Sequence, residues 1–397
     1  MMPTYYVDGH VHIGRTSSGQ AVKISAANNL TVEGILQEAM VRKGLDIIGI
    51  IDAVSPPVQS DIRELLEQGD LEALSAGGLR YKEKVTLLLG AEVEVAGPHG
   101  GAAHFGVFVP TLSALQELST WLAFRQTNPT LSSQRITTGT AEQLATLCQD
   151  LAGIFIINHA FTPHKGLYGN CVNVMSDMVS TNLVTGVELG LSADTDMADR
   201  LSELADFTFV TNSDAHSLPK LAREYHVVSL TEPTFDAYKQ ALLRRQDQRI
   251  VMNIGLMPAL GKYHRTACRK CGNRLEEPSQ PCPTCGSMAR VRGVWERLLE
   301  VADLQESKSP LHRPPYIHQV PLEFIPGLGQ KKREQLFHAF GTEMNILHHT
   351  SLSDLRNVVG DTLAQMIDQA RTGQLMVTPG AGGRYGKITD GQPTEKK

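Results

Sequence analysis

Two histidines near the N-terminus, His10 and His12, follow an apolar β-prone run at residues 5–7 and the pair Asp8-Gly9. Side chains i and i+2 of a strand point to the same face, so both imidazoles are predicted to point the same way, as in a metal site. Because a chain with 14 His can hold such a pair by chance, the interpretation depends on the residues downstream.

Further histidines and carboxylates stand where predicted strands give way to loops. Strands are predicted near residues 5–7, 47–51, 85–91, 104–109, 154–158, 185–189, 206–210 and 226–230. The polar residues at or near their ends are Asp8, His10, His12, Asp52, Glu92, His159, Glu188, Asp214 and His216, whereas His104 begins a strand. Burying so many ionisable groups is costly unless they pair with one another or bind cations.

This mixture of imidazole and carboxylate suits borderline divalent ions such as Zn²⁺, Mn²⁺ or Fe²⁺. The residues suffice for at least two ions, with Glu92 available to bridge them. Two neighbouring ions suit phosphoester hydrolysis, because they acidify a water molecule and neutralise charge on the phosphate and the leaving oxygen.

Helical patterns alternate with these strands. They cover residues 32–42 behind a Thr31 cap, 112–123, 140–151, 197–204 and 235–244. Such alternation is typical of parallel strands joined by crossover helices. We therefore predict an α/β fold with a distorted (β/α)-barrel, in which functional groups collect at the C-terminal strand ends.

Four cysteines form a second, separate motif. Cys268-x-x-Cys271 and Cys282-x-x-Cys285 lie ten residues apart, and a glycine follows each pair. Two such knuckles complete a closed tetrahedral site, so the sequence predicts a structural zinc ion that does not catalyse. The other two cysteines, Cys148 and Cys171, are isolated and are predicted to be reduced thiols.

The charge is unevenly distributed along the chain. Residues 1–240 hold 15 Lys and Arg against 27 Asp and Glu, whereas residues 241–340 hold 16 against 9. A basic segment beside an acidic catalytic body favours nucleic acid as a partner, although a solvated basic face gives the same pattern. Arg269 and Lys270, within the cysteine motif, are candidate phosphate contacts.

Residues 325–333 read as a glycine hairpin that opens a helix, and they resemble the helix-hairpin-helix element of DNA-binding proteins. Gly327, Gly329, Lys331 and Lys332 match the positions that hold a phosphate at a helix N-terminus. Residues 378–388 form either a flexible tail or a tight loop that brings Arg384 and Tyr385 onto the substrate. Residues 389–397 are predicted to be disordered.

A chain of 397 residues suits one large domain with smaller ones attached. The predicted parts are a catalytic domain (1–235), a connecting segment (236–262), a Cys₄ zinc module (263–293), a mainly helical region (294–376) and a Gly-rich tail (377–397). No apolar run reaches the roughly 20 residues that span a bilayer, and the start lacks the features of a signal peptide. We expect a cytoplasmic protein without a membrane partner.

The segments DGHVH, IIGIID, GAEVE, INHAFTPH and NSDAH resemble, in this order, the motifs of the PHP (polymerase and histidinol phosphatase) phosphoesterases over residues 4–230. The resemblance implies that His10, His12, Glu92, His159, Asp214 and His216 bind metal, with Asp52 and His104 at further ligand positions, and that Asp214, Glu92 and His159 are catalytic. Glu188 is either a ligand or a carboxylate that orients one. Ser18 and Ala53 stand where some members have additional histidines, so two ions are expected rather than three.

The whole order of parts resembles the endonuclease Q family. That resemblance implies a DNA repair endonuclease that cuts duplex DNA on the 5′ side of uracil, hypoxanthine, xanthine or an abasic site. Two catalytic ions (Zn, Mn, Mg or Fe), one structural zinc, lesion-containing double-stranded DNA and DNA repair or replication proteins are the implied cofactors and partners.

A lesion must leave the base stack to be read, and this is easier for a mispaired nucleotide. The glycine-rich loop 164–170 is a candidate for the base pocket. His164 and Lys165 are then substrate contacts, Tyr168 stacks on the base and Asn170 reads its keto edge. For His164, an ordinary loop histidine is the alternative.

Two other functions fit the same residues. A PHP phosphatase acting on a small phosphate monoester needs the same ions but not the basic segment. A scaffold that recruits repair partners without catalysis needs only the zinc. About three metal ions per chain would indicate the enzyme, and one zinc ion the scaffold.

Overall fold

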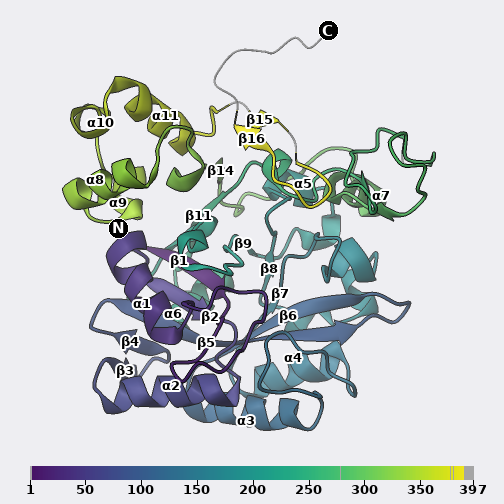
Figure 1. Ribbon diagram of the computed structural model, residues 1–397. Helices are drawn as coiled ribbons and strands as arrows, with labels where there is room; N and C mark the ends of the chain where they lie inside the picture. The colour runs from purple at the N-terminus through teal and green to yellow at the C-terminus, as the bar shows by residue number, and fades with distance from the viewer. Residues whose placement is uncertain (1, 278, 376, 379, 389–397) are drawn as a thin grey trace.

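A curled, mixed β-sheet of 12 strands forms the centre of the molecule (Figure 1). The computed structural model describes residues 2–388 except 278, 376 and 379, so the disorder predicted for residues 389–397 lies outside the described residues. The strand order is β14 (Tyr316–His318), β11 (Arg249–Gly255), β10 (Tyr225–Ser229), β1 (Thr4–Val11), β2 (Ile47–Ile50), β5 (Val85–Ala96), β6 (Ala102–Val109), β7 (Ile154–Ile157), β8 (Gly186–Glu188) and β9 (Phe209–Val210), and the hairpin of β3 (Leu71–Ala73) and β4 (Leu79–Tyr81) pairs with β5.

Apolar side chains cover both faces of this sheet. Along β5, Leu87 and Leu89 belong to one buried cluster and Leu88 to another, as the period of two in a strand requires. Because both faces are buried, β2 and β5 read in the sequence as nearly continuous apolar runs. The predicted α/β fold with a curled, barrel-like sheet is confirmed.

Within the described residues, five helices cover the sheet, and four of them begin at a capping threonine. They are α1 (Val32–Glu38), α2 (Pro56–Glu67), α3 (Leu112–Ala123), α4 (Ala141–Asp150) and α6 (Phe235–Leu242). Thr31, Thr111, Thr140 and Thr234 each accept a hydrogen bond from a backbone N–H of the first turn of α1, α3, α4 and α6, respectively. The helix predicted at 197–204 is instead divided between α5 (Thr195–Ala198) and a 3-10 turn (Ser202–Leu204).

The prediction of purely parallel strands is wrong for part of the sheet. β1 and β10, β5 and β6, and β6 and β7 pair antiparallel. The β5–β6 link is a short turn at residues 97–101, where Gly100 and Gly101 have φ of 99° and 71°, and a turn of this length reverses the chain. Glu94 therefore lies opposite His104, which explains why a candidate ligand begins a strand.

The sheet extends beyond the predicted domain boundary at residue 235. Strand β11 comes from the predicted connecting segment, and β14 from the predicted helical region. The Asn253 side chain of β11 donates a hydrogen bond to the backbone oxygen of Phe209 on β9 at 3.0 Å. This contact joins the two ends of the curled sheet.

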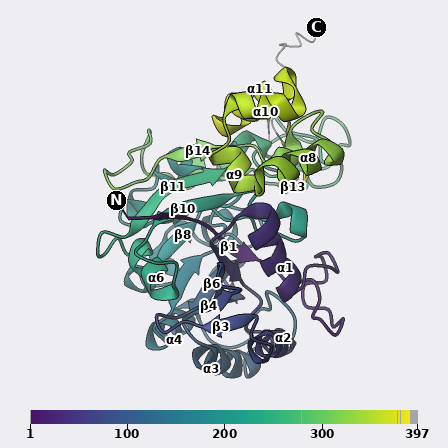
Figure 2. The ribbon, with the colours of Figure 1, turned by 90° about the vertical axis from the view of Figure 1, so that its left-hand side faces the viewer.

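The C-terminal residues form two lobes above the barrel (Figures 1 and 2). One lobe holds the cysteine motif, with β12 (Ala267–Cys268), β13 (Arg290–Val291) and α7 (Val294–Val301), and the other holds α8 (Gln330–Phe340), α9 (Glu343–His348), α10 (Leu352–Val359) and α11 (Asp361–Arg371). The short strands β15 (Val377–Thr378) and β16 (Lys387–Ile388) lie between them. Among the helices of the described residues, none has the length and apolarity that a bilayer crossing requires.

A buried ion pair fixes the helical lobe on the barrel. Lys43 Nζ lies 2.6 Å from Glu343 Oε2, and both residues are buried. Removing one partner of such a pair leaves a buried charge without a partner, which costs about 3–5 kcal/mol. We expect Glu343→Ala to lower the free energy of unfolding by that amount in chemical denaturation. The control is Glu334→Ala, which removes the exposed partner of Arg42 and is expected to cost about 1 kcal/mol or less.

Candidate active site

Seven of the eight predicted catalytic-metal ligands converge at one edge of the sheet. Their donor atoms form three overlapping groups: His10, His12 and Glu92; His12, Asp214 and His216; and Glu92, His104 and His159. Residues that are up to 206 positions apart thus share one small volume. The eighth predicted ligand, Asp52, lies behind His12.

Close contact between backbones brings the N-terminal motif into place. The register of β1 and β2 shifts between Asp8 and Val11, and a side chain on Gly49 would come within 2.3 Å of the backbone oxygen of Gly9. The buried Asp8 carboxylate accepts hydrogen bonds from the backbone N–H groups of Ser213 and Ala222. Asp8 thereby fixes the loop that carries Asp214 and His216 against the histidine strand.

The donor atoms around His10 and His12 have spacings close to those of a tetrahedral metal site. His10 Nε2 lies 3.4 Å from Glu92 Oε1 and 3.6 Å from Asp214 Oδ1, and His12 Nε2 lies 3.7 Å from Glu92 Oε2 and 3.3 Å from Asp214 Oδ1. Ligands about 2.1 Å from a tetrahedral zinc ion lie about 3.4 Å apart. These spacings therefore suit bound divalent ions, with Asp214 grouped with His12 and His216 rather than with Glu92.

A second group shares the Glu92 carboxylate. Glu92 Oε1 lies 3.0 Å from His104 Nδ1 and 3.3 Å from His159 Nε2. Because Glu92 belongs to both groups, it is placed to bridge two ions, as the sequence predicts.

The outer ring nitrogens of three of the histidines are held by neighbours, which turns the inner ones toward the cluster. His10 Nδ1 lies 3.0 Å from Glu188, His12 Nδ1 lies 3.0 Å from Asp52, and His159 Nδ1 lies 3.1 Å from the Thr162 hydroxyl. In contrast, the buried His10 Nε2 has no hydrogen-bond partner in the described residues. Carboxylates behind metal-binding imidazoles fix their tautomer and orientation, so this arrangement fits bound ions.

Two of the candidate ligands have unusual backbone conformations. His159 and Asp214 have φ of 30° and 46°, in the left-handed region that L-residues rarely adopt. Such conformations cost about 1–3 kcal/mol each and persist where the surroundings enforce them. Here they direct an imidazole and a carboxylate toward the cluster.

The charges of the cluster compensate one another. Burial by itself would raise the pKa of Glu92, but the imidazoles of His104, His10 and His159 outweigh it and hold this pKa well below the usual value. Burial would likewise raise the pKa of Asp214, and the histidines beside it lower that pKa strongly. Both carboxylates are therefore ionised and ready to bind cations.

Asp52 contacts the metal ligands from behind. Its Oδ2 lies 3.0 Å from His12 Nδ1 and accepts a hydrogen bond from the Ile13 backbone N–H at 2.8 Å. If Asp52 positions His12, Asp52→Asn should keep both ions and weaken their affinity about 10- to 100-fold. Titration of the metal-free protein with Zn²⁺ measures this, and complete loss of one ion would indicate direct ligation instead. The control is Asp61→Asn, a carboxylate bonded to Ser17.

Glu188 has a comparable place beside His10. Its Oε2 contacts the His10 ring and accepts a hydrogen bond from the Asn212 amide at 2.9 Å, and its Oε1 accepts one from the His159 backbone N–H at 3.2 Å. Of the two roles that the sequence leaves open, the geometry favours orientation of the ligands.

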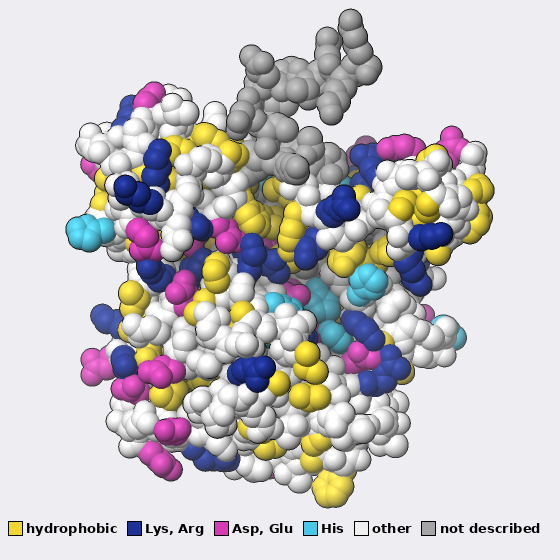
Figure 3. Space-filling view, in the orientation of Figure 1, with side chains coloured by type: hydrophobic (Ala, Val, Ile, Leu, Met, Phe, Trp, Pro, Cys, Tyr) yellow, Lys and Arg dark blue, Asp and Glu magenta, His cyan; other side chains and the backbone are white. Residues whose placement is uncertain are grey.

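A cavity of about 500 Å³ opens beside the cluster, and His159, Asp214 and His216 form part of its wall. The rest of the wall comes from several parts of the chain: Ser25, Thr162, Glu188, Gly190, Leu191, Ser192, Asn212, Ser217, Lys220, Arg223, Lys262, Tyr263 and Tyr385. Arg223 donates hydrogen bonds to the Tyr385 hydroxyl at 2.6 Å and to the Asp214 backbone oxygen at 3.1 Å. In the space-filling view, His side chains lie in a hollow and Lys and Arg side chains surround it (Figure 3).

The Gly-rich segment before residue 389 folds back as a loop onto this cavity. The backbone N–H groups of Gly380, Gly383 and Gly386 donate to the backbone oxygens of Ala259, Lys262 and Leu260, respectively. Of the two open interpretations of this segment, the tight loop is therefore the one observed. It brings Tyr385 into the wall of the cavity, whereas Arg384 is exposed.

The structure corrects the expected roles of loop 164–170. Tyr168 is fully buried and stacks on Phe161 with 5.4 Å between the ring centres, so it cannot stack on an entering base. Asn170 does not line the cavity and its amide donates to Ala102. Lys165 is paired with Glu94 at 2.8 Å. The exposed His164 contacts the edge of Tyr263, which does line the cavity.

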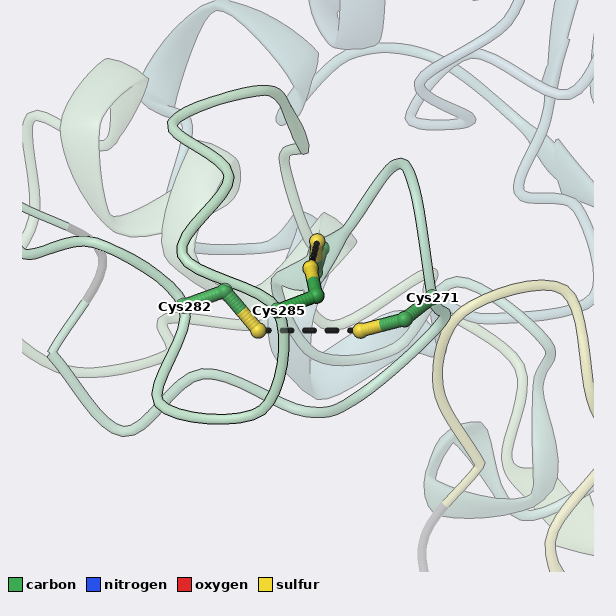
Figure 4. Close-up of side chains that lie close together, drawn as sticks. Cys271, Cys282 and Cys285 are labelled. Atoms are coloured by element: carbon green, nitrogen blue, oxygen red, sulfur yellow. Dashed lines mark hydrogen bonds between the residues drawn. The ribbon is translucent and has the colours of Figure 1, made fainter.

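The four motif cysteines form a compact cluster (Figure 4). Cys268 Sγ lies 3.5 Å from Cys285 Sγ, and Cys271 Sγ lies 3.6 Å from Cys282 Sγ. Sulfur atoms about 2.3 Å from a tetrahedral zinc ion lie about 3.8 Å apart, so the cluster fits one structural zinc. Gly272 and Gly286 have φ of 74° and 68°, as the turns behind the knuckles require.

The predicted phosphate contacts lie on the surface of the two lobes. Arg269, Lys270, Lys331 and Lys332 are exposed. Gly327 has a φ of 77°, and Gly329 is the N-cap of α8. No ion pair with a described carboxylate engages these four cations, which are therefore available to an anionic partner.

Sequence reasoning missed several residues of the site. Lys23 and Ser133 touch the metal ligands, and Arg223 and Lys262 line the cavity. They lie in loops whose local sequence carries no metal or nucleotide motif, so only the fold identifies them.

Comparisons of the sequence with known proteins find two uncharacterized relatives. No protein-family model matches the chain. The uncharacterized protein YqxK of Bacillus subtilis is 44% identical over 389 residues, which cover 98% of this chain and 100% of that protein. The uncharacterized protein MJ0043 of Methanocaldococcus jannaschii is 36% identical over 261 residues, 59% of this chain but 32% of that longer protein.

Two solved structures match the complete chain. The lesion-specific endonuclease PfuEndoQ of Pyrococcus furiosus is 29% identical and matches with a TM-score of 0.84. The match covers 100% of this chain and 98% of that one. A structure of endonuclease Q in complex with a 27-mer duplex carrying an abasic lesion at the active site matches with the same values. The chain therefore belongs to the endonuclease Q family.

Proposed function

We infer that the protein is a DNA repair endonuclease that hydrolyses one phosphodiester bond on the 5′ side of a deaminated base (uracil, hypoxanthine or xanthine) or an abasic site. The observation that carries this proposal is the 500 Å³ cavity that shares His159, Asp214 and His216 with the candidate metal cluster. A nucleotide bound in this cavity would place its phosphate next to the cluster. The abasic duplex bound by the similar endonuclease supports the same arrangement.

The residues around the phosphate have two roles, which are binding the metal ions and orienting the metal ligands. His10, His12, Glu92, Asp214, His104 and His159 would hold two divalent ions, which supply an acidified water and positive charge to the phosphate. Glu188 and Asp52 hold the ligand rings in orientation. Zn²⁺, Mn²⁺, Mg²⁺ and Fe²⁺ are the candidate ions, and imidazole-rich coordination favours Zn²⁺, Mn²⁺ or Fe²⁺ over Mg²⁺.

The cavity suits a nucleotide that has left the duplex. Its wall combines two aromatic rings, Tyr263 and Tyr385, with the cations Lys220, Arg223 and Lys262. Aromatic rings provide stacking surface and cations attract phosphate, so both parts of a nucleotide find complementary chemistry. A nucleotide flips out at lower cost where it is mispaired or lacks a base, which favours lesions over normal pairs.

The basic residues of the two lobes support a long DNA partner over a small one. Arg269 and Lys270 lie on the zinc module, and Lys331 and Lys332 lie on the helical lobe. These lobes stand on either side above the barrel (Figures 1 and 3). Contacts at both lobes require a ligand longer than a monoester. We also propose that the enzyme acts in the cytoplasm and has DNA repair or replication proteins as partners.

The experiment uses end-labelled duplexes with one uracil, hypoxanthine, xanthine or abasic site, and undamaged duplex as substrate control. Each is incubated with protein loaded with Zn²⁺, Mn²⁺ or Mg²⁺. We expect one nick 5′ to each lesion by the wild type and none in undamaged duplex. Asp214→Asn is expected to abolish nicking, whereas Asp206→Asn, which changes an exposed carboxylate outside the site, should keep it.

Absence of a lesion-dependent nick with every metal would refute the endonuclease. Hydrolysis of p-nitrophenyl phosphate, unaffected by added DNA, would indicate the phosphatase alternative. A protein that binds lesion duplex with one zinc per chain and no cleavage would indicate the scaffold.

A further inference from the structure

We propose that Lys23 supplies a third, fixed positive charge to the metal centre and binds a nonbridging oxygen of the phosphate to be cleaved. The Lys23 ammonium lies 3.4 Å from His12 Nε2 and 3.7 Å from Glu92 Oε2. It thus contacts ligands of the candidate ions, without belonging to any of the predicted motifs. This role rests on the proposed phosphoester hydrolysis.

The backbone holds Lys23 firmly in this place. The Lys23 N–H donates to the Ile13 backbone oxygen at 2.8 Å, and its own backbone oxygen accepts from Ala26 at 3.0 Å. The next residue, Ala27, donates to the backbone oxygen of His216 at 2.8 Å. Both sides of the loop are therefore bonded to segments that carry metal ligands, so the ammonium approaches a substrate with little loss of conformational freedom.

Ser133 orients the ammonium and leaves hydrogen-bond donors for a ligand. Lys23 Nζ donates to Ser133 Oγ at 2.7 Å, and Ser133 Oγ in turn donates to Glu92 Oε2. Ser133 has a φ of 52°, a conformation that non-glycine residues rarely adopt. An ammonium has three N–H donors, of which Ser133 accepts one, and an ion held by His12 Nε2 would displace the ammonium from that nitrogen. Two donors then remain for phosphate oxygen.

The side chain is accessible from the site. It is 18% exposed, whereas Glu92 and His12 beside it are 1% exposed. An ammonium that is nearly buried among ligands but still reaches solvent can exchange a water molecule for a phosphate oxygen. Charge-assisted hydrogen bonds of this kind are about twice as strong as neutral ones.

The two positions at which some PHP members have additional histidines offer no ligand for a third metal ion here. Ser18 is exposed and its hydroxyl is bonded to Thr16, and Ala53 is a buried methyl group without a donor atom. Lys23 therefore completes the charge of a two-ion centre.

The experiment compares wild type with Lys23→Met, Lys23→Arg and the control Lys84→Met, an exposed lysine in the turn before β5. Metal content is measured by mass spectrometry after gel filtration, and affinity for inorganic phosphate by calorimetry on the metal-loaded proteins. We expect three ions per chain in all four proteins. Phosphate affinity should fall about tenfold in Lys23→Met and recover in part in Lys23→Arg.

Nicking of the lesion duplex provides the second readout. We expect kcat to fall about 100-fold in Lys23→Met, as when one preorganised donor to a transition-state oxygen is removed, and to be unchanged in Lys84→Met. Equal phosphate affinity in wild type and Lys23→Met, or four ions per chain in the wild type, would overturn the proposal. Because phosphate binding and metal content do not require cleavage, they test Lys23 even if no lesion duplex is cut.

Discussion

Glu92→Gln should reduce the metal content from three ions per chain to one and abolish nicking. The Glu92 carboxylate is shared by both ligand groups, and its oxygens lie within 3.0–3.7 Å of nitrogen atoms of four histidines. The neutral amide of the variant side chain would bind divalent ions weakly. Its NH₂ group would also direct N–H donors, which cannot bind a cation, toward one of the two sites. The remaining ion is the zinc of the cysteine cluster.

The expected loss of activity is about 10³-fold or more, since the charge stabilisation by catalytic ions is worth several kcal/mol. Mass spectrometry gives the metal content and single-turnover nicking gives the rate. Glu72→Gln, which changes an exposed carboxylate on β3, is the matched control and should retain three ions and full activity. Three ions in Glu92→Gln would show that Glu92 does not bridge.

Cys282→Ser should remove the structural zinc and unfold the cysteine module. Cys282 is buried, with 2% of its surface exposed, and its Sγ lies 3.6 Å from Cys271 Sγ. The apolar contacts of the module are few: Leu275 and the cysteines themselves form its small buried cluster. Zinc binding in such modules contributes about 10–16 kcal/mol, which is most of their folding free energy.

Loss of the module should also weaken the active site. A side chain on Gly382 would meet the Gly272 backbone within 2.2 Å, so the loop that carries Tyr385 rests on the module. We expect limited proteolysis between residues 265 and 292, two remaining ions per chain and at least tenfold weaker binding of lesion duplex. Cys148→Ser changes a buried cysteine outside the cluster and is the control. Full DNA affinity without the zinc would contradict the link between module and cavity.

The sequence was informative where spacing by itself constrains geometry. The cysteine cluster could be predicted because each Cys-x-x-Cys knuckle directs two thiolates toward one ion. The helices α1, α3 and α4 could be predicted because each is an amphipathic run preceded by a threonine. The strands β2, β5 and β7 were recognisable because both of their faces are buried. In each case the cause lies within a few neighbouring residues.

The strand directions and the base cavity were not predictable in the same way. His104 reaches the cluster because β6 runs antiparallel to β5, and that reversal depends on a turn at residues 97–101 rather than on the strand residues. Tyr168 was expected at the substrate because it stands in a glycine-rich loop, but the stacking partner Phe161 holds it in the core.

The sequence by itself determined that His10, His12, Glu92, His159 and Asp214 are potential metal ligands, because their types and their places after strands leave few other roles. Only the tertiary structure decided that Asp52 and Glu188 stand behind the ligands, that Lys23 stands beside them, and that Arg223 and Tyr385 close one wall of the cavity. Ligand chemistry is a property of a residue type, which the sequence states directly. Orientation and enclosure depend on contacts between residues as far apart as 223 and 385, and folding alone creates those contacts.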